Sequence, residues 1–94
     1  MLTGKKLIRR SEKEAKALRA IAHPHRLAIL HLLNGTDMRL KELAMHVQGS
    51  QSLMMHHLKI LIEQKFIGTY RVGARTFYRL EKNNLDRAMK TCSI

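Results

Sequence analysis

The sequence has 94 residues, enough for one small domain. A domain this short buries only about 60–70% of the surface of its unfolded chain, so a hydrophobic face shared with a second copy would enlarge a thin core. Its 18 Lys and Arg against 7 Asp and Glu give a net charge of +11. Such a surplus favours a polyanionic partner, above all nucleic acid, although a ribosome-associated or merely soluble basic protein has the same composition.

Several classes of protein are excluded by what the chain lacks. A single cysteine, Cys92, rules out an internal disulfide and a thiol pair for zinc within one chain. No apolar run approaches the roughly 18–20 residues of a membrane span, and the basic N-terminus lacks the apolar stretch of a secretory signal. We therefore expect a cytoplasmic protein. No acid/base pair, nucleophile constellation or phosphate-binding glycine loop is visible, so we expect neither an enzyme nor a cofactor.

The first half of the chain predicts a basic arm followed by two helices. Residues 1–10 are expected to be a flexible arm, and residues 11–94 the folded domain. Ser11 and Glu14 fit a capping box, which predicts a first helix over about residues 11–22. Pro24 suits the first turn of a second, largely apolar helix. Asn34 and Gly35 should end that helix, with Gly35 free to adopt a left-handed conformation.

The middle of the chain predicts two helices joined by a tight turn. Leucine, alanine and valine recur at helical spacing over about residues 40–47, and Gln48-Gly49 follows as a turn. Ser50 is a good N-cap for a further helix that runs to about Gln64. Two helices joined in this way, the second with a polar start, are typical of a helix-turn-helix.

The last third predicts a hairpin and a final helix. The segment from Phe66 to Leu80 is apolar and β-branched around a Gly-containing turn at residues 72–75, which indicates two strands with a basic tip. Asn83 or Asn84 can cap a last helix. The expected fold is therefore α+β and mostly helical, a winged helix-turn-helix of about five helices plus a two-stranded wing.

Four segments resemble one family of regulators. Residues 50–61 (SQSLMMHHLKIL) are similar to the pattern Ser-Gln-Ser-x-x-Ser-His-His-Leu-Lys-x-Leu of the bacterial and archaeal ArsR/SmtB winged-helix repressors. Residues 22–30 (AHPHRLAIL), 41–44 (KELA) and 76–80 (TFYRL) also match segments of that family in the same order. The resemblance covers about residues 15–82 and implies a homodimeric repressor of bacterial or archaeal origin that binds double-stranded DNA.

The start of the helix at Ser50 carries the side chains suited to read DNA. Short polar groups fit against backbone and base edges, and Gln51 can pair with an adenine edge in the major groove. Met55, where the resembled family usually has Ser, can contact a thymine methyl group. The residues expected at DNA are Ser50, Gln51, Ser52, Met55, His56, Lys59, Arg71 and Arg75. Ser50 could instead act only as a cap, and the wing arginines could lie on a merely solvated turn.

The other face of this helix should be core. Met54, Leu58 and Leu61 recur at the spacing of an inward stripe. Adjacent residues on a helix point about 100° apart, so His56 and His57 cannot easily share a metal ion. We therefore expect His57 to be partly buried or hydrogen-bonded.

The resemblance also implies where two copies meet. In that family the first and last helices form the dimer interface, and the apolar residues suited to it here are Leu18, Ile21, Leu85, Ala88 and Met89. Such a dimer would place two reading helices about 34 Å apart, so the operator should be an inverted repeat.

The family's usual metal ligands are missing. The positions of its third-helix cysteines hold Arg39 and Lys41, and the last helix holds Asp86 without a histidine. We therefore expect no metal cofactor and no metal response at either place. Cys92 could respond to oxidants or persulfide, or the regulator could have no small-molecule effector.

These observations favour a sequence-specific DNA-binding repressor. Two alternatives stay open, a winged-helix module that binds protein and an architectural protein that binds DNA without sequence preference.

Overall fold

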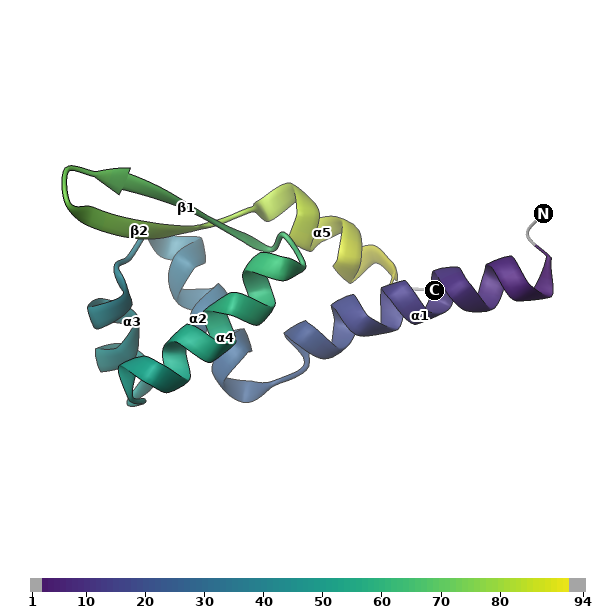
Figure 1. Cartoon of the computed structure of the whole chain (residues 1–94), viewed down its shortest axis with the longest axis horizontal. Helices are drawn as coiled ribbons and strands as arrows, with labels where there is room; N and C mark the ends of the chain where they lie inside the picture. Colours follow the sequence, from purple (N-terminus) through teal and green to yellow (C-terminus); the bar gives the residue numbers. More distant parts are fainter. Residues whose placement is uncertain (1–2, 92–94) are drawn as a thin grey trace.

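The structure is a computed structural model that describes residues 3–91. Five helices and one β-hairpin follow one another along the chain (Figure 1). They are α1 (Gly4–Ile21), α2 (Pro24–Gly35), α3 (Leu40–Val47), α4 (Gln51–Glu63), β1 (Ile67–Val72), β2 (Arg75–Leu80) and α5 (Lys82–Thr91). This order confirms the winged helix-turn-helix that the sequence predicts.

The turn between α3 and α4 is tight for local reasons. Gln48 has a left-handed backbone (φ 55°), and a Cβ on Gly49 would lie 2.9 Å from the Met54 side chain, so glycine allows the close approach. The Ser50 hydroxyl then accepts a hydrogen bond from the Leu53 amide at 3.1 Å. The predicted cap is confirmed, and it fixes where α4 begins.

The hairpin forms with the predicted turn. Its two strands are antiparallel, with Ile67 opposite Leu80 and Val72 opposite Arg75, and Gly73 supplies the positive φ of 63° at the tip. An isolated bridge between Met38 and Tyr78 attaches β2 to the loop before α3. The hairpin also packs against α2 and α4, so the wing is anchored on the helix-turn-helix.

The first helix is longer than predicted. It begins at Gly4, so residues 4–10, expected to be a loose arm, are helical, and Ser11 lies inside the helix instead of capping it. Lysine, arginine and leucine are good helix formers, and Arg10 pairs with Glu14 at 2.9 Å across one turn. The N-terminal half of α1 projects from the body and gives the molecule its extents of 48 × 24 × 20 Å (Figure 1).

Two predictions about helix ends are wrong. Because α5 begins at Lys82, neither Asn83 nor Asn84 is its cap. The Asn84 side chain instead donates a 2.8 Å hydrogen bond to the carbonyl of Lys65, whose φ of 61° is left-handed. Gly35 is the last residue of α2, and the chain continues from it in an extended conformation at Thr36 without a left-handed glycine.

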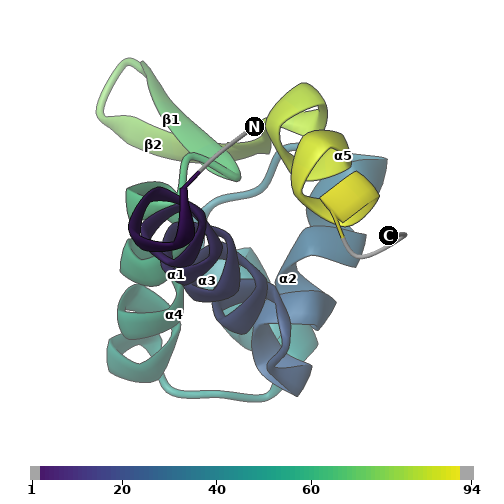
Figure 2. The same ribbon diagram turned by 90° about the vertical axis from the view of Figure 1, so that its right-hand side faces the viewer.

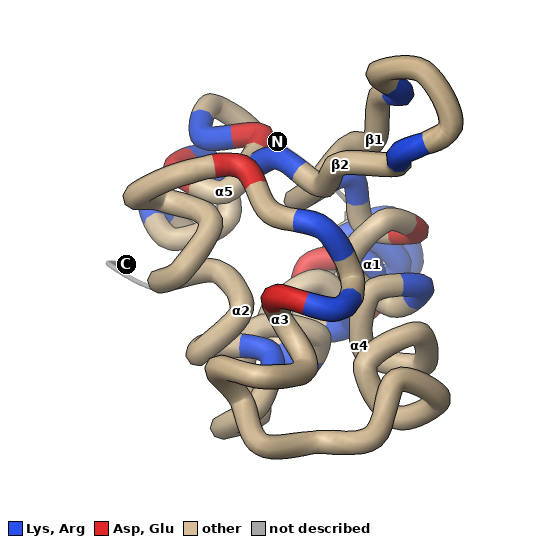
Figure 3. Tube along the Cα trace, turned by 90° about the vertical axis from the view of Figure 1, so that its left-hand side faces the viewer, with Lys and Arg blue, Asp and Glu red and all other residues tan. Residues whose placement is uncertain are grey.

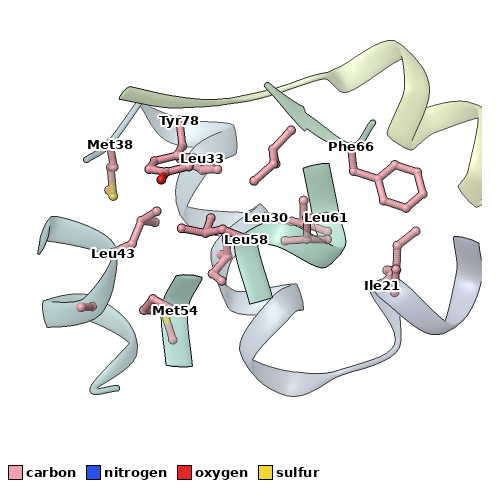
Figure 4. Packing of buried hydrophobic residues seen from close by; sticks show 14 residues of the cluster. Ile21, Leu30, Leu33, Met38, Leu43, Met54, Leu58, Leu61, Phe66 and Tyr78 are labelled. Carbon is pink, nitrogen blue, oxygen red and sulfur yellow. The ribbon is translucent and has the colours of Figure 1, made fainter. Parts of the chain in front are cut away.

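The core lies where α2, α3, α4 and the base of the wing meet (Figure 4). Met54, Leu58 and Leu61 are fully buried, which confirms the inward stripe predicted for α4. Ile21, expected on the dimer surface, is only 6% exposed and lies in the core on the side of Phe66 (Figure 4). Among residues 3–91, no helix combines the length and apolar character needed to cross a bilayer.

Candidate nucleic-acid interface

One face of α4 is open to solvent and carries the predicted reading residues. Gln51, Ser52, Met55, His56 and Lys59 are all exposed. The opposite face, with Met54, His57, Leu58 and Leu61, is buried. Since Ser50 caps the helix and is itself exposed, the first turn presents short polar side chains beside free backbone amides, a surface suited to phosphate and base edges.

The wing carries its two predicted arginines near the tip. Arg71 lies opposite Thr76 in the hairpin register, Arg75 lies opposite Val72, and both arginines are exposed. Figure 3 shows Lys and Arg along the wing, at the start of α3 and over α1, with acidic residues beside them at the start of α3. The wing therefore carries positive charge in addition to that on α1 and near α3.

A groove runs between α4 and the wing. It has a volume of about 550 Å³ and is lined by Ser52, Met55, His56, Leu58, Lys59, Ile62, Glu63 and Tyr78. Four of the predicted DNA-contacting residues therefore share one surface with a side chain of β2. The Tyr78 hydroxyl donates to Met55 Sδ at 3.7 Å, which joins the wing to the exposed face of α4.

A polar contact holds the middle of the wing. The Tyr70 hydroxyl donates to Asp37 Oδ2 at 2.6 Å, and the Tyr70 ring stacks on Phe77 with centroids 5.4 Å apart. The Arg79 guanidinium lies 5.8 Å from the same ring. The hydrogen bond to Asp37 raises the pKa of Tyr70, because it favours the protonated phenol.

Behind the exposed face of α4, the Arg26 side chain connects three helices. Its Nε donates to the carbonyl of Ala20 at 2.6 Å, its Nη2 to the carbonyl of Arg19 at 3.3 Å, and its Nη1 lies 3.3 Å from His57 Nδ1. These contacts attach the start of α2 to the end of α1 and to the buried side of α4. The guanidinium therefore satisfies carbonyls at the end of α1 and fixes the His57 ring on the buried side of α4.

The His57 ring is held neutral. It is 3% exposed and its centroid lies 4.6 Å from that of His23 and 5.5 Å from that of His25. Burial, reinforced by these rings and by the Arg26 charge, lowers the pKa of His57 to about 4. The prediction that His57 is partly buried or hydrogen-bonded is confirmed: the ring is buried, Nδ1 lies beside Arg26, and Nε2 has no hydrogen-bond partner among the described residues.

The expected dimer residues lie on α1 and α5, which pack against each other. Leu18, Leu85 and Ala88 are partly buried, and Met89 is 47% exposed. Leu7 and Ile8, which the sequence reasoning assigned to a loose arm, are 50% and 59% exposed on the projecting half of α1. Figure 2, which looks along α1, shows α5 beside α2 and away from α3 and α4.

Three site residues escaped the sequence reasoning. These residues are Arg26, Tyr70 and Tyr78, whose hydrogen-bond partners lie 31, 33 and 23 residues away in the sequence. Local residue spacing therefore could not predict their roles. Of the two aromatic residues of β2, Tyr78 is buried and Phe77 is partly buried. Cys92, the candidate redox residue, lies outside the described residues.

The chain is similar to known transcriptional regulators. Residues 23–68 match the model of the family described as "Bacterial regulatory protein, arsR family". The chain is 39% identical over 68 residues to the transcriptional repressor SdpR of Bacillus subtilis (strain 168), an alignment that covers 72% of this chain and 76% of that protein. It is 33% identical over 69 residues to the arsenical resistance operon repressor of Staphylococcus xylosus, covering 73% of this chain and 66% of that repressor.

A solved structure agrees with these sequence matches. The crystal structure of NolR from Sinorhizobium fredii superposes with a TM-score of 0.82 at 32% identity, covering 99% of this chain and 89% of that one. The agreement extends over the whole described fold, including the projecting α1.

Proposed function

The chain belongs to the ArsR family of bacterial regulatory proteins, and we propose that it is a sequence-specific repressor that occupies an operator as a dimer. A regulator of this family acts on transcription, and DNA is the partner that the basic surface fits.

One observation carries the proposal. The exposed face of α4 presents Gln51 and Ser52 at a capped N-terminus, and Arg71 and Arg75 are exposed near the tip of the wing, at the same end of the molecule (Figure 1). Gln51 supplies both a donor and an acceptor, the pair needed to read adenine in the major groove. Arg71 and Arg75 contact phosphates of the DNA backbone or enter a narrow minor groove. The side chains proposed to read bases and the arginines proposed to bind phosphate thus lie at one end of the domain.

A second copy of the chain is the proposed partner at α1 and α5. Isolated helices that project into water are marginal, and α1 carries the exposed apolar residues Leu7 and Ile8 on its projecting half. The partner's α1 and α5 would cover these side chains together with Met89 and the exposed edge of Leu18. Two-fold symmetry then places two reading helices on successive turns of an inverted repeat.

The proposed repressor does not respond to metal at the family's usual places. Arg39 and Lys41 occupy the start of α3, and Asp86 on α5 has no histidine on the same helix. In the part of the chain that the structure describes, no three His, Cys, Asp or Glu side chains are grouped to hold an ion. Cationic side chains at neutral pH are not ligands for divalent metals.

A band-shift titration tests the proposal. The full chain is mixed with its own promoter DNA and with a scrambled duplex of equal length and composition. We expect tighter binding to the promoter by about a thousandfold or more. Equal affinity for both duplexes would indicate an architectural protein. Gln51→Ala together with Arg75→Ala should abolish promoter binding, whereas a protein-interaction module would keep its partner.

A further inference from the structure

Met55 is an apolar side chain on a polar surface. It is 48% exposed on α4, between Ser52 and Lys59 on the face that the proposed function assigns to DNA. Its neighbours on the inward side are fully buried, so the core does not need Met55 for packing. An exposed thioether at this place is available for a contact made outside the monomer.

Tyr78 limits where the Met55 side chain can go. The Tyr78 side chain is 7% exposed, and its backbone is fixed by two hydrogen bonds with Met38, at 2.7 and 3.1 Å. Its hydroxyl donates to Met55 Sδ at 3.7 Å, and a nearly buried hydroxyl needs such a partner. The sulfur is therefore held toward the wing, which reduces the freedom of an otherwise flexible side chain.

Beyond the sulfur the side chain ends in a methyl group, and Met55 is one of the residues that line the groove between α4 and the wing. In the major groove, the only apolar group that distinguishes one base from another is the 5-methyl of thymine. Glutamine, serine and histidine on the same face read donors and acceptors, and none of them offers an apolar contact of this size. Of the exposed apolar side chains on α4, Met55 is the most exposed, at 48% against 39% for Leu53 and for Ile62, so it is the one best placed to meet a base.

We infer that Met55, positioned by the Tyr78 hydroxyl, is a specificity-determining residue that reads a thymine methyl group in the operator. This inference rests on the proposed sequence-specific binding and adds one base preference to it. Burying one methyl group is worth about fourfold in affinity per subunit, so two subunits give about fifteenfold.

The test starts by selecting a duplex from a random-sequence pool with the full-length protein. Each thymine of the selected half-site is then replaced in turn by deoxyuridine, which removes the methyl group and leaves the hydrogen-bonding edge unchanged. We expect one position in each half-site at which deoxyuridine weakens binding about fourfold, or about fifteenfold when both half-sites are changed. A pool that yields no preferred sequence would overturn the proposed function itself.

Variants assign the methyl contact to Met55. Met55→Gln keeps the length of the side chain and removes its apolar end, so its affinities for the thymine and deoxyuridine duplexes should be equal. Met55→Leu keeps an apolar end and should retain most of the preference. Tyr78→Phe keeps the ring in the core and removes only the hydroxyl, so we expect the thymine preference to fall to about twofold while the ranking of bases elsewhere is unchanged.

Two results would overturn the inference while leaving sequence-specific binding intact. One is a selected operator whose affinity does not change with deoxyuridine at any position. The other is a thymine preference that survives unchanged in Met55→Gln.

Discussion

The Arg26 guanidinium of α2 lies 3.3 Å from Nδ1 of His57, the buried histidine of α4, and also donates to the Ala20 carbonyl at the end of α1. One side chain therefore connects the three helices that support the reading face. The His57 ring is buried beside a permanent cation and two further histidines, so its protonation is coupled to the packing of α4 against α2.

Acid should destabilise the protein through His57. Its folded-state pKa of about 4 lies below the ordinary 6.5, so the unfolded chain binds a proton more readily than the folded one. The free energy of unfolding therefore has its full value above pH 6.5 and decreases as the pH falls toward 4. Between pH 7.5 and 5.0 we expect a loss of about 2 kcal/mol from this group. The lowered pKa of His23 acts in the same direction.

Urea unfolding of the wild type and of His57→Gln at the two pH values checks this. The variant should lose about 2 kcal/mol less on acidification than the wild type does. The exposed His31, changed to Gln, serves as the control and should behave as the wild type. If the wild type and His57→Gln lose equal stability on acidification, His57 is not a cause of the acid sensitivity.

Arg26 should matter to stability more than an exposed arginine does. Arg26→Met keeps much of the aliphatic stem but removes the hydrogen bonds to the carbonyls of Ala20 and Arg19. Bonds from a charged donor contribute about 1.5–3 kcal/mol, so a loss of about 2 kcal/mol in the free energy of unfolding is expected. Arg19→Met, at an exposed side chain, should change it by less than about 0.5 kcal/mol. Similar losses in both variants would contradict the role given to Arg26.

The contact between Tyr70 and Asp37 should be visible in a phenol titration. Asp37→Ala removes the acceptor 2.6 Å from the Tyr70 hydroxyl, so the pKa of Tyr70 should fall toward its ordinary value. The chain has two tyrosines and no tryptophan, which makes absorbance near 295 nm a clean readout. The pKa of Tyr78, which burial raises, should stay where it is and acts as the internal control. An unchanged Tyr70 titration would show that Asp37 does not hold the wing.

The projecting half of α1 should be a dimer surface. Ile8 is 59% exposed, so Ile8→Glu leaves the monomer fold intact and places a charge where the partner is expected. Sedimentation equilibrium should show a shift from dimer toward monomer. Thr36→Glu makes the same charge change in the exposed loop after α2 and should remain dimeric. A dimer unaffected by Ile8→Glu would exclude this part of α1 from the interface.

Where sequence periodicity and core packing coincide, the sequence was enough to predict the fold. Leu43, Met54, Leu58 and Leu61 recur at helical spacing, and the same residues fill the core of α3 and α4. Ser50 and Gly73 were predictable because a cap and a left-handed turn each need a particular residue type. Because the inward residues of α4 define its helical phase, they also predicted which of its residues are exposed.

The start of α1 was not predictable in this way. Residues 4–10 are all exposed, so their helix depends on local propensity and on pairs such as Arg10–Glu14. These local preferences compete with the capping signal at Ser11. Ile21 was assigned to the dimer surface because the helical spacing of α1 does not reveal that this residue is buried in the core on the side of Phe66 (Figure 4). Contacts such as Arg26–His57 join residues whose approach depends on the whole fold.

The measurement closest to the central claim is the affinity ratio between the selected operator and a scrambled duplex, for the wild type and for Gln51→Ala. If the α4 face reads sequence, the wild-type ratio is about a thousand or more, and Gln51→Ala lowers it about 5- to 150-fold. Nonspecific affinity should be little changed, because the charges on the wing and on α3 remain. A wild-type ratio near one, or a ratio that Gln51→Ala leaves unchanged, would contradict the claim that this face of α4 reads DNA.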